Sequence, residues 1–217
     1  MRQGAAAGTP EPARDCTLCP RLTAYRADNR ARNPDWWNGP APSFGDPQAR
    51  LLVLGLAPGR TGANRTGRPF TGDHAGILLF GTLLKTGFAR GAYEARADDG
   101  LTLVDCMISN AVRCAPPGNR PEPSEEAACR PFLAARLEAL PRLKVVVTLG
   151  DVARRNLLRA LGLPGSAGVS GHGAEFAAGG YTVLNSYHCS RLNTNTGRLT
   201  PGMFEAIFLR ARTLLDS

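Results

Sequence analysis

Short apolar runs alternate with segments of helical character along most of this chain. Where apolar residues follow one another with few polar breaks we expect buried strands, at residues 50–56, 102–112, 144–149 and 181–187. Longer segments with helical spacing or capping signals predict helices at residues 75–86, 124–140, 151–160 and 200–215. Strands that alternate with helices predict an α/β fold, a three-layer α/β/α sandwich around a central four-stranded, mostly parallel sheet.

Residues that favour helix starts precede several of these segments. We expect Ser124 and Asp151 to act as N-caps, and Thr200 followed by Pro201 is a typical helix start. Asp73 stands just before the first long helix and is also a strong N-cap candidate. These signals support the helix boundaries drawn from the apolar pattern.

The chain of 217 residues suits one medium-sized domain. We expect a disordered tail at residues 1–14, rich in Ala, Gly, Pro and charge, followed by a single domain over 15–217. No apolar run is long enough to span a membrane and no signal peptide is visible, so we expect a cytoplasmic protein without a membrane partner.

The charge balance is basic, with a formal net charge of +8. Lys85 and Lys144 are the only lysines, so arginine carries nearly all of the positive charge. An arginine excess favours a phosphate-bearing partner such as nucleic acid, because the planar guanidinium matches phosphate oxygens, although a coding bias towards arginine remains the alternative.

The first strand leads into a glycine-rich loop that extends from Gly55 to Asp73 and holds three arginines. A strand, a glycine-rich loop and a helix in succession are how open α/β folds present backbone N–H groups to a ligand. The loop has neither the Gly-x-Gly-x-x-Gly fingerprint nor a Gly-Lys-Ser/Thr triplet, since its last basic residue is Arg68 before Pro69. Dinucleotide and P-loop nucleotide binding are therefore disfavoured.

Four of the six cysteines form two spaced pairs, Cys16 and Cys19, then Cys114 and Cys129. Structural disulfides are not expected inside the cell, so metal binding is the leading use of these thiols. Proline directly after Cys19 and at 116–117 after Cys114 stiffens the loops, as at iron–sulfur sites. A zinc site and buried free thiols remain the alternatives, and the other two cysteines, Cys106 and Cys189, are expected to be non-ligands.

Four motifs in this order resemble the uracil-DNA glycosylase superfamily. They are Gly-Leu-Ala-Pro-Gly at 55–59, Arg-Thr-Gly-Arg-Pro-Phe-Thr-Gly-Asp at 65–73, Asn-Ala-Val-Arg-Cys-Ala-Pro-Pro-Gly-Asn at 110–119 and His-Cys-Ser-Arg-Leu-Asn at 188–193. The four cysteines match the iron–sulfur branches of that family. Leu56 stands where family 4 has Glu, and Asp73 resembles family 5, the type b enzymes. The resemblance implies a structural 4Fe–4S cluster at Cys16, Cys19, Cys114 and Cys129.

The resemblance also assigns roles in base excision to cleft residues. It implies that Phe70 stacks on a flipped uracil and that His188 donates to uracil O2 as negative charge gathers there. Asn110 is the expected reader of the uracil edge, with Asn119 as the alternative. Asp73 is either a positioner of water and a counter-charge to the sugar cation or only a helix cap, and the sequence leaves both open.

Further positions are expected to lie against the base or the DNA. Gly55 and Ala57, in the first motif, bring backbone close to the uracil. A second group of residues is expected to contact DNA. Residues 191–193 resemble the segment that enters DNA at the vacated base, with Leu192 as an apolar wedge, and the arginines would contact phosphates. The group consists of Arg65, Arg68, Arg191, Leu192, Asn193 and Arg198.

The sequence thus predicts a monomeric DNA repair enzyme that excises uracil from DNA by hydrolysis and leaves an abasic site. It leaves open whether hypoxanthine, xanthine or thymine is also removed. One alternative is a non-catalytic iron–sulfur or zinc protein of the same fold that only binds nucleic acid. A second is a redox protein that uses the cluster for electron transfer, although no further cofactor motif supports it.

Overall fold

The computed structural model describes residues 10–217, and residues 1–9 of the predicted tail lie outside the described residues. Its elements are α1 (Pro20–Arg32), β1 (Phe44–Gly45), β2 (Leu51–Gly55), α2 (Ala63–Thr66), α3 (His74–Lys85), β3 (Ala89–Arg90), β4 (Thr102–Leu103), β5 (Cys106–Asn110), η1 (Pro117–Asn119), α4 (Pro123–Glu138), β6 (Val145–Leu149), α5 (Asp151–Ala160), β7 (Glu175–Ala178), β8 (Tyr181–Ser186), α6 (Arg191–Asn195) and α7 (Pro201–Asp216). No helix in the described part of the chain combines the length and apolarity needed to cross a membrane.

The central sheet has six strands in the order β1-β5-β2-β6-β8-β7. The inner four, β5, β2, β6 and β8, are parallel and coincide with the four predicted strands. The expected count of four is wrong because two short antiparallel strands, β1 and β7, extend the edges. The edge strands are only two and four residues long, too short for hydrophobic patterning to reveal them.

The predicted strand at 102–112 divides in two. Asp105 adopts a left-handed backbone with φ of 53°, which breaks the extended chain between β4 and β5. Strand β4 therefore leaves the main sheet and pairs with β3 in a separate two-stranded sheet. The Asp105 carboxylate accepts a hydrogen bond from the backbone N–H of Arg50, which fixes this break next to the start of β2.

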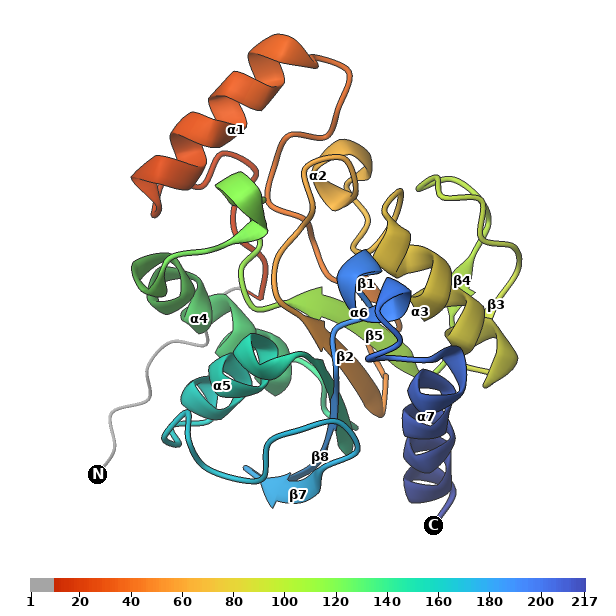
Figure 1. The fold of residues 1–217 in the computed structure, drawn as a ribbon. Helices are drawn as coiled ribbons and strands as arrows, with labels where there is room; N and C mark the ends of the chain where they lie inside the picture. Colours follow the sequence, from red (N-terminus) through yellow and green to blue (C-terminus); the bar gives the residue numbers. More distant parts are fainter. Residues whose placement is uncertain (1–9) are drawn as a thin grey trace.

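Helices cover both faces of the sheet (Figure 1). Leu51 and Val53 of β2 join a core with α3 and α7 on one face, whereas Leu52 and Leu54 join a core with α4 and α5 on the other. This alternation follows from the two-residue period of a strand, and both sides are apolar because both are covered. The expected α/β class is confirmed.

Capping interactions fix the helix starts. The hydroxyl of Thr200 accepts from the Met203 backbone N–H, as the sequence predicts for α7. At α4 the expected Ser124 cap is wrong, because Glu122 forms a capping box with Glu125 and Pro123 takes the first helical position. At α5 the cap is Gly150, and Asp151 is the first helical residue.

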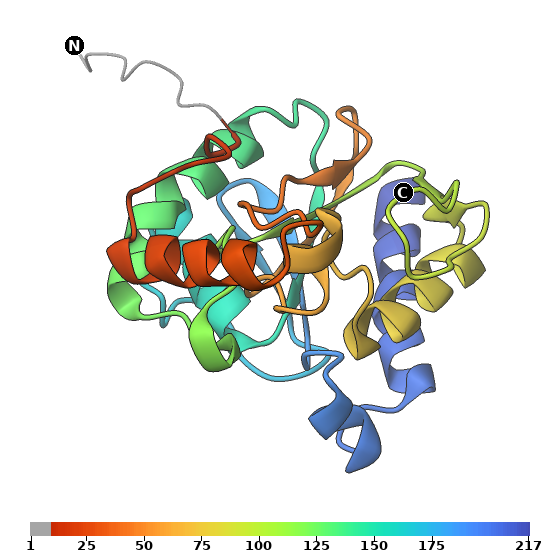
Figure 2. The ribbon, with the colours of Figure 1, turned by 90° about the horizontal axis from the view of Figure 1, so that it is seen from above.

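The segment before α1 is anchored to the body of the protein. The Glu11 carboxylate accepts hydrogen bonds from the guanidinium groups of Arg113 and Arg136. Helix α1 itself lies across the end of the molecule beside α2 and η1 (Figures 1 and 2). Leu22 of α1 packs against Val112 and Cys129 in a small separate core. The ordered contacts therefore begin within the predicted tail, before residue 15.

The carboxyl ends of the parallel strands gather the functional loops. Gly55 at the end of β2 is paired in register with Asn110 at the end of β5. The loop after β8 begins at the same edge, because Ser186 pairs with Leu149 at the end of β6. In open α/β sheets ligands bind at this edge.

Candidate active site

A cleft of about 530 Å³ opens where the loops after β2, β5 and β8 meet. The loop after β2 contains the motifs at 55–59 and 65–73, the loop after β5 contains the motif at 110–119, and the loop after β8 contains the motif at 188–193. The residues of the predicted site that line the cleft are Ala57, Phe70, Asp73, Asn110, Asn119, His188 and Arg191. Sequence positions more than 100 residues apart thus come together in one concave site of a size suited to a small ring.

Phe70 forms one wall of the cleft. Its side chain is 7% exposed, and its backbone adopts a left-handed φ of 56°, which costs a non-glycine residue about 1–3 kcal/mol. A Cβ added to Gly55 would lie 2.6 Å from the Phe70 ring and would overlap Asn110 Oδ1, so only glycine fits beneath these two side chains. Gly55 therefore packs beneath Phe70 and Asn110 and is not itself among the residues that line the cleft.

Asn110 lines the cleft, and its side-chain amide is largely buried. The residue is 2% exposed, and its Oδ1 atom has no hydrogen-bond partner among the described residues. An unpaired buried acceptor costs about 1–3 kcal/mol, which a ligand N–H would offset. Asn119 lies in η1 at the rim, exposed and with a φ of 57°. The two candidate asparagines thus differ in depth within the cleft.

His188 faces Phe70 from the loop after β8. The two ring centroids lie 6.2 Å apart with an interplanar angle of 29°. Burial lowers the pKa of His188, so the imidazole is neutral at pH 7 and keeps one N–H donor. The side-chain amide of Asn193 donates to the His188 carbonyl oxygen over 2.8 Å and fixes the loop. Asn193, an expected DNA contact, thereby holds the histidine loop.

Asp73 uses its two carboxylate oxygens differently. Oδ1 accepts a hydrogen bond of 3.0 Å from the Gly76 backbone N–H and caps α3. Oδ2 faces the glycine-rich loop, where a Cβ on Gly59 would lie 3.3 Å away and one on Gly62 would overlap it. Burial raises the pKa of this carboxyl above its ordinary value. The cap is confirmed, and the second oxygen is directed towards the loop that lines the cleft.

Most of the expected DNA contacts lie on the surface around the cleft. Arg65 and Arg191 are exposed, and Arg198 is exposed with its guanidinium 4.4 Å from the Tyr187 ring centroid. Leu192 is 72% exposed on α6, which stands away from the body of the molecule in Figure 2. An exposed leucine on a projecting helix is available for insertion into DNA.

Arg68 does not fit the expected role at the surface. Its side chain is 5% exposed and forms a two-pronged ion pair with Asp99, with both N–O distances at 2.7 Å. The guanidinium Nε also donates to Thr71 Oγ1. Since its donors are used inside the protein, Arg68 supports the Phe70 turn and cannot reach a DNA phosphate. The sequence could not reveal this because Asp99 is distant along the chain.

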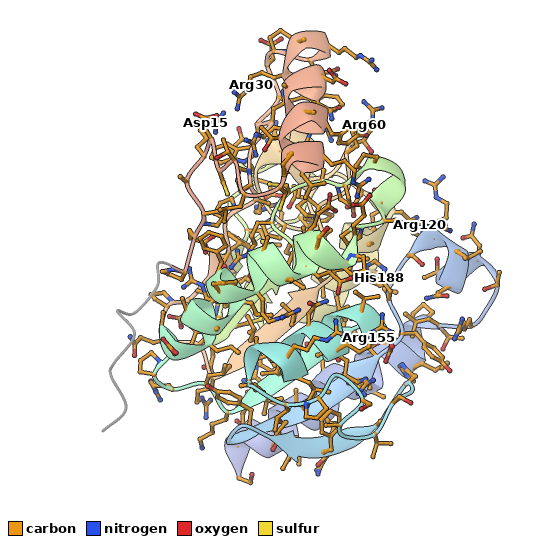
Figure 3. The ribbon with its side chains drawn as sticks, turned by 90° about the vertical axis from the view of Figure 1, so that its left-hand side faces the viewer. Asp15, Arg30, Arg60, Arg120, Arg155 and His188 are labelled. Carbon is orange, nitrogen blue, oxygen red and sulfur yellow. The ribbon has the colours of Figure 1, made fainter. Side chains whose placement is uncertain are left out.

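Sequence reasoning missed two exposed arginines near the cleft. Arg60 lines the cleft beside Gly59, and Arg120 follows Asn119 at the rim. Figure 3 shows both on the same side of the molecule as His188. The position of Arg60 within the glycine-rich loop was the available signal. A second cleft of about 540 Å³ adjoins the first at His188 and is also lined by Asn193 and Arg198.

The four predicted ligand cysteines surround one cavity beneath α1, and Cys106 and Cys189 are not among its lining residues. Within residues 10–217, no three His, Cys, Asp or Glu side chains are grouped to hold a single metal ion. The Arg113 backbone N–H donates to Cys129 Sγ over 3.3 Å, and Arg26 donates to Cys114 Sγ over 3.6 Å. Four converging thiols with N–H donors to sulfur are the donor set that suits an iron–sulfur cluster.

Comparison with known proteins decides the family. The sequence model of the uracil-DNA glycosylase superfamily matches residues 42–212, which include the whole cleft. The chain belongs to the uracil-DNA glycosylase superfamily. The matched region spans the four motifs on which the resemblance rests, so that interpretation of the sequence is confirmed.

Relatives within this superfamily indicate the branch. A type-5 uracil-DNA glycosylase of Thermus thermophilus is 46% identical over 205 residues, which cover 92% of this chain and 93% of the relative. A type-5 uracil-DNA glycosylase of Pyrobaculum aerophilum is 42% identical, covering 91% and 88% respectively. A type-4 uracil-DNA glycosylase of Thermotoga maritima is 38% identical over only 50% of this chain and 49% of the relative. The expected type-5 resemblance is confirmed.

Proposed function

We propose that this chain is a type-5 uracil-DNA glycosylase that extrudes uracil from DNA and hydrolyses its N-glycosidic bond. The observation that carries the proposal is one cleft lined by Phe70, Asn110 and His188, in which the buried Asn110 Oδ1 has no hydrogen-bond partner among the described residues. Uracil N3–H is a donor for such an acceptor, and the base has a flat face for the ring. The product is an abasic site in the DNA.

Asn110 and Phe70 recognise the extruded base. Stacking on Phe70 holds the base plane, while the Asn110 amide reads the N3–H and O4 edge. Asn110 is favoured over Asn119 because its acceptor is buried and unpaired, whereas Asn119 lies at the exposed rim. Gly55 and Ala57 let the backbone approach the base.

His188 stabilises the leaving group. Cleavage of the glycosidic bond places negative charge on uracil, and an N–H donor at O2 offsets it. The neutral imidazole already carries this N–H donor and does not have to be protonated first. Loss of one such donor typically lowers the rate by about 100-fold to 1,000-fold.

Asp73 acts at the sugar. Its Oδ2, which is not the oxygen that caps α3, faces the loop at Gly59 and Gly62. An ionised carboxylate there orients the attacking water and offsets the positive charge that develops on the deoxyribose. Capping and catalysis are compatible because they use different oxygens of the same group.

Duplex DNA is the proposed partner, held along its backbone. Arg65, Arg191 and Arg198 contact phosphates, and Arg60 and Arg120 extend this set; the support is that all five are exposed. Leu192 enters the stack at the vacated base.

Cys16, Cys19, Cys114 and Cys129 would hold a 4Fe–4S cluster, whose role would be structural, since the hydrolysis needs no redox step.

An alkali cleavage assay tests the proposal against the non-catalytic alternative. The protein is incubated with end-labelled duplexes that contain uracil, hypoxanthine, xanthine or a G·T thymine, and abasic sites are then cleaved with alkali. We expect strand cleavage with the uracil duplex, and the other three define the range of bases. Tight binding of the uracil duplex without cleavage above background would favour a DNA-binding protein without glycosylase activity.

A further inference from the structure

The Phe70 turn is held in a backbone conformation that its own sequence does not favour. Phe70 is not glycine, yet its φ is 56°. Such a residue stays in this region only where its surroundings constrain it. Because this turn sets the direction of the Phe70 ring, whatever constrains it also sets the wall of the cleft.

Tyr93 supplies one constraint from a distant part of the chain. Its hydroxyl donates to the Phe70 carbonyl oxygen over 3.2 Å and accepts from the Gly72 backbone N–H over 3.3 Å. Burial raises the pKa of Tyr93, so the hydroxyl keeps the proton that it donates. The ring packs on Phe80 of α3 with centroids 4.6 Å apart. One hydroxyl group thus bridges the two ends of the turn that carries the Phe70 ring.

The same loop supplies a second constraint. Asp99 pairs with Arg68 on the other side of the turn, and Arg68 donates to Thr71. The Arg68 guanidinium holds the pKa of Asp99 well below its usual range. Backbone N–H groups of Glu94 and Leu101 also donate to Asp99 and shape its loop. Figure 1 shows this loop, between β3 and β4, alongside α3.

Helix α3 closes the turn from a third side. A Cβ on Gly76 would overlap the Phe70 carbonyl oxygen and would approach the Tyr93 hydroxyl to 2.5 Å. The helix backbone is therefore in direct contact with the turn. With Tyr93, Asp99 and α3 around it, the turn has little room for another conformation.

We propose that Tyr93 is a positioning residue for base excision, which holds the Phe70 ring in its stacking orientation. The proposal rests on the function proposed above. Tyr93 touches neither the base nor the sugar, and it acts through the backbone of the turn. A displacement of about 1 Å in a reacting geometry can cost up to about 100-fold in rate.

A double-mutant cycle with Phe70 tests this proposal. Tyr93→Phe keeps the ring and removes both hydrogen bonds, so we expect a single-turnover excision rate about tenfold lower on a uracil duplex. In the Phe70→Ala background the same change should lower the rate by less than about twofold, because the ring it positions is gone. Tyr181→Phe, at the far end of β8, is the matched control and should leave the rate unchanged.

Each outcome bears on a distinct claim. If the wild-type protein excises no uracil, the proposed function fails. If the wild-type protein excises uracil, two results overturn the positioning role. One is that Tyr93→Phe lowers the rate equally in the wild-type and Phe70→Ala backgrounds, and the other is that it lowers the rate in neither. Rates are measured below the melting temperatures of all variants. Should Tyr93→Phe not fold, Asp99→Asn removes charge from the other anchor of the turn, and the same dependence on Phe70 is expected.

Discussion

At the scale of single residues, burial and hydrogen-bond partners show which predicted residues line the cleft and which support the fold, a distinction that residue type alone does not make. The sequence predicted Phe70, Asp73, Asn110 and His188 as site residues because motif order carries that information, and all four line one cleft. It could not predict that Arg68 turns inward, since that depends on a partner 31 residues away. Residues of one motif can be buried or exposed, as Arg68 and Arg65 are, and the motif alone does not predict which.

Replacement of Asp73 separates capping from catalysis. Asn caps a helix about as well as Asp, whereas Ala does not and costs about 1 kcal/mol. We expect Asp73→Asn and Asp73→Ala both to lower the excision rate by at least about 100-fold, because both remove the charge at the sugar. Thermal melts should show a lower melting temperature for Asp73→Ala only. Full activity in either variant would contradict a catalytic role.

The pH dependence follows from the directions of two pKa shifts. Asp73 acts as a carboxylate and its pKa is raised, so the rate should rise with pH through a value above the ordinary pKa of aspartate. His188 is a neutral donor with a lowered pKa, so no loss of rate is expected as the pH passes about 6.5. Single-turnover rates between pH 4 and 8 on a uracil duplex measure both features. A rate that falls as the pH rises through the lowered pKa of His188, below 6.5, would indicate a required imidazolium.

The ionisation of Asp73 should lower the stability of the folded protein as the pH rises, although it raises the excision rate. The folded-state pKa lies above the unfolded value, so ionisation of this carboxyl destabilises the folded state as the pH rises. Asp73→Asn should therefore melt at a temperature equal to or above that of the wild type at pH 8, and this difference should shrink towards acid pH. Thermal melts at several pH values measure it, and a difference that grows towards acid would contradict burial of the charge.

At the scale of elements, the predicted strands and the last helix are largely right because their apolar runs are long and uninterrupted. The departures occur where a few residues decide the backbone. Asp105 breaks one predicted strand, and Pro123 with Glu122 moves the start of α4. Edge strands β1 and β7 escape prediction because pairing with a neighbour, and not their own composition, makes them strands.

Helix α6 should contribute more to the excision rate on duplex DNA than on single-stranded DNA. Leu192→Ala removes the apolar wedge, and we expect the excision rate on a uracil duplex to fall about tenfold while the rate on single-stranded DNA changes little. Leu209→Ala on α7 is the matched control, because Leu209 is also exposed, at 51%, and lies on a different helix. Equal losses on both substrates would argue against a wedge.

At the scale of the whole molecule, α1 is joined to the body through a small core and the cysteine cavity. The spacing of the cysteines suggested a shared site, and the fold brings together two pairs that lie far apart in the sequence. The partners of α1 could not be derived from its own weak periodicity. We therefore expect the attachment of α1 to be stabilised by a metal group held by these four thiols.

Metal analysis and thermal melts test that dependence. Protein purified without oxygen should contain about four irons per chain, and Cys16→Ser should lower both the iron content and the melting temperature. Cys106→Ala, at a cysteine outside the cavity, should leave the iron content unchanged. Stoichiometric zinc without iron would instead support the zinc alternative.

The most direct test of the cleft as a uracil pocket is the single-turnover release of free uracil by Asn110→Ala and Asn119→Ala. We predict that Asn110→Ala slows release from a uracil duplex by about 100-fold, because the base edge loses its buried partner, and that Asn119→Ala stays within about threefold of wild type. Binding to an abasic duplex, measured in parallel, should be equal in both variants. Unchanged release by Asn110→Ala would contradict the account.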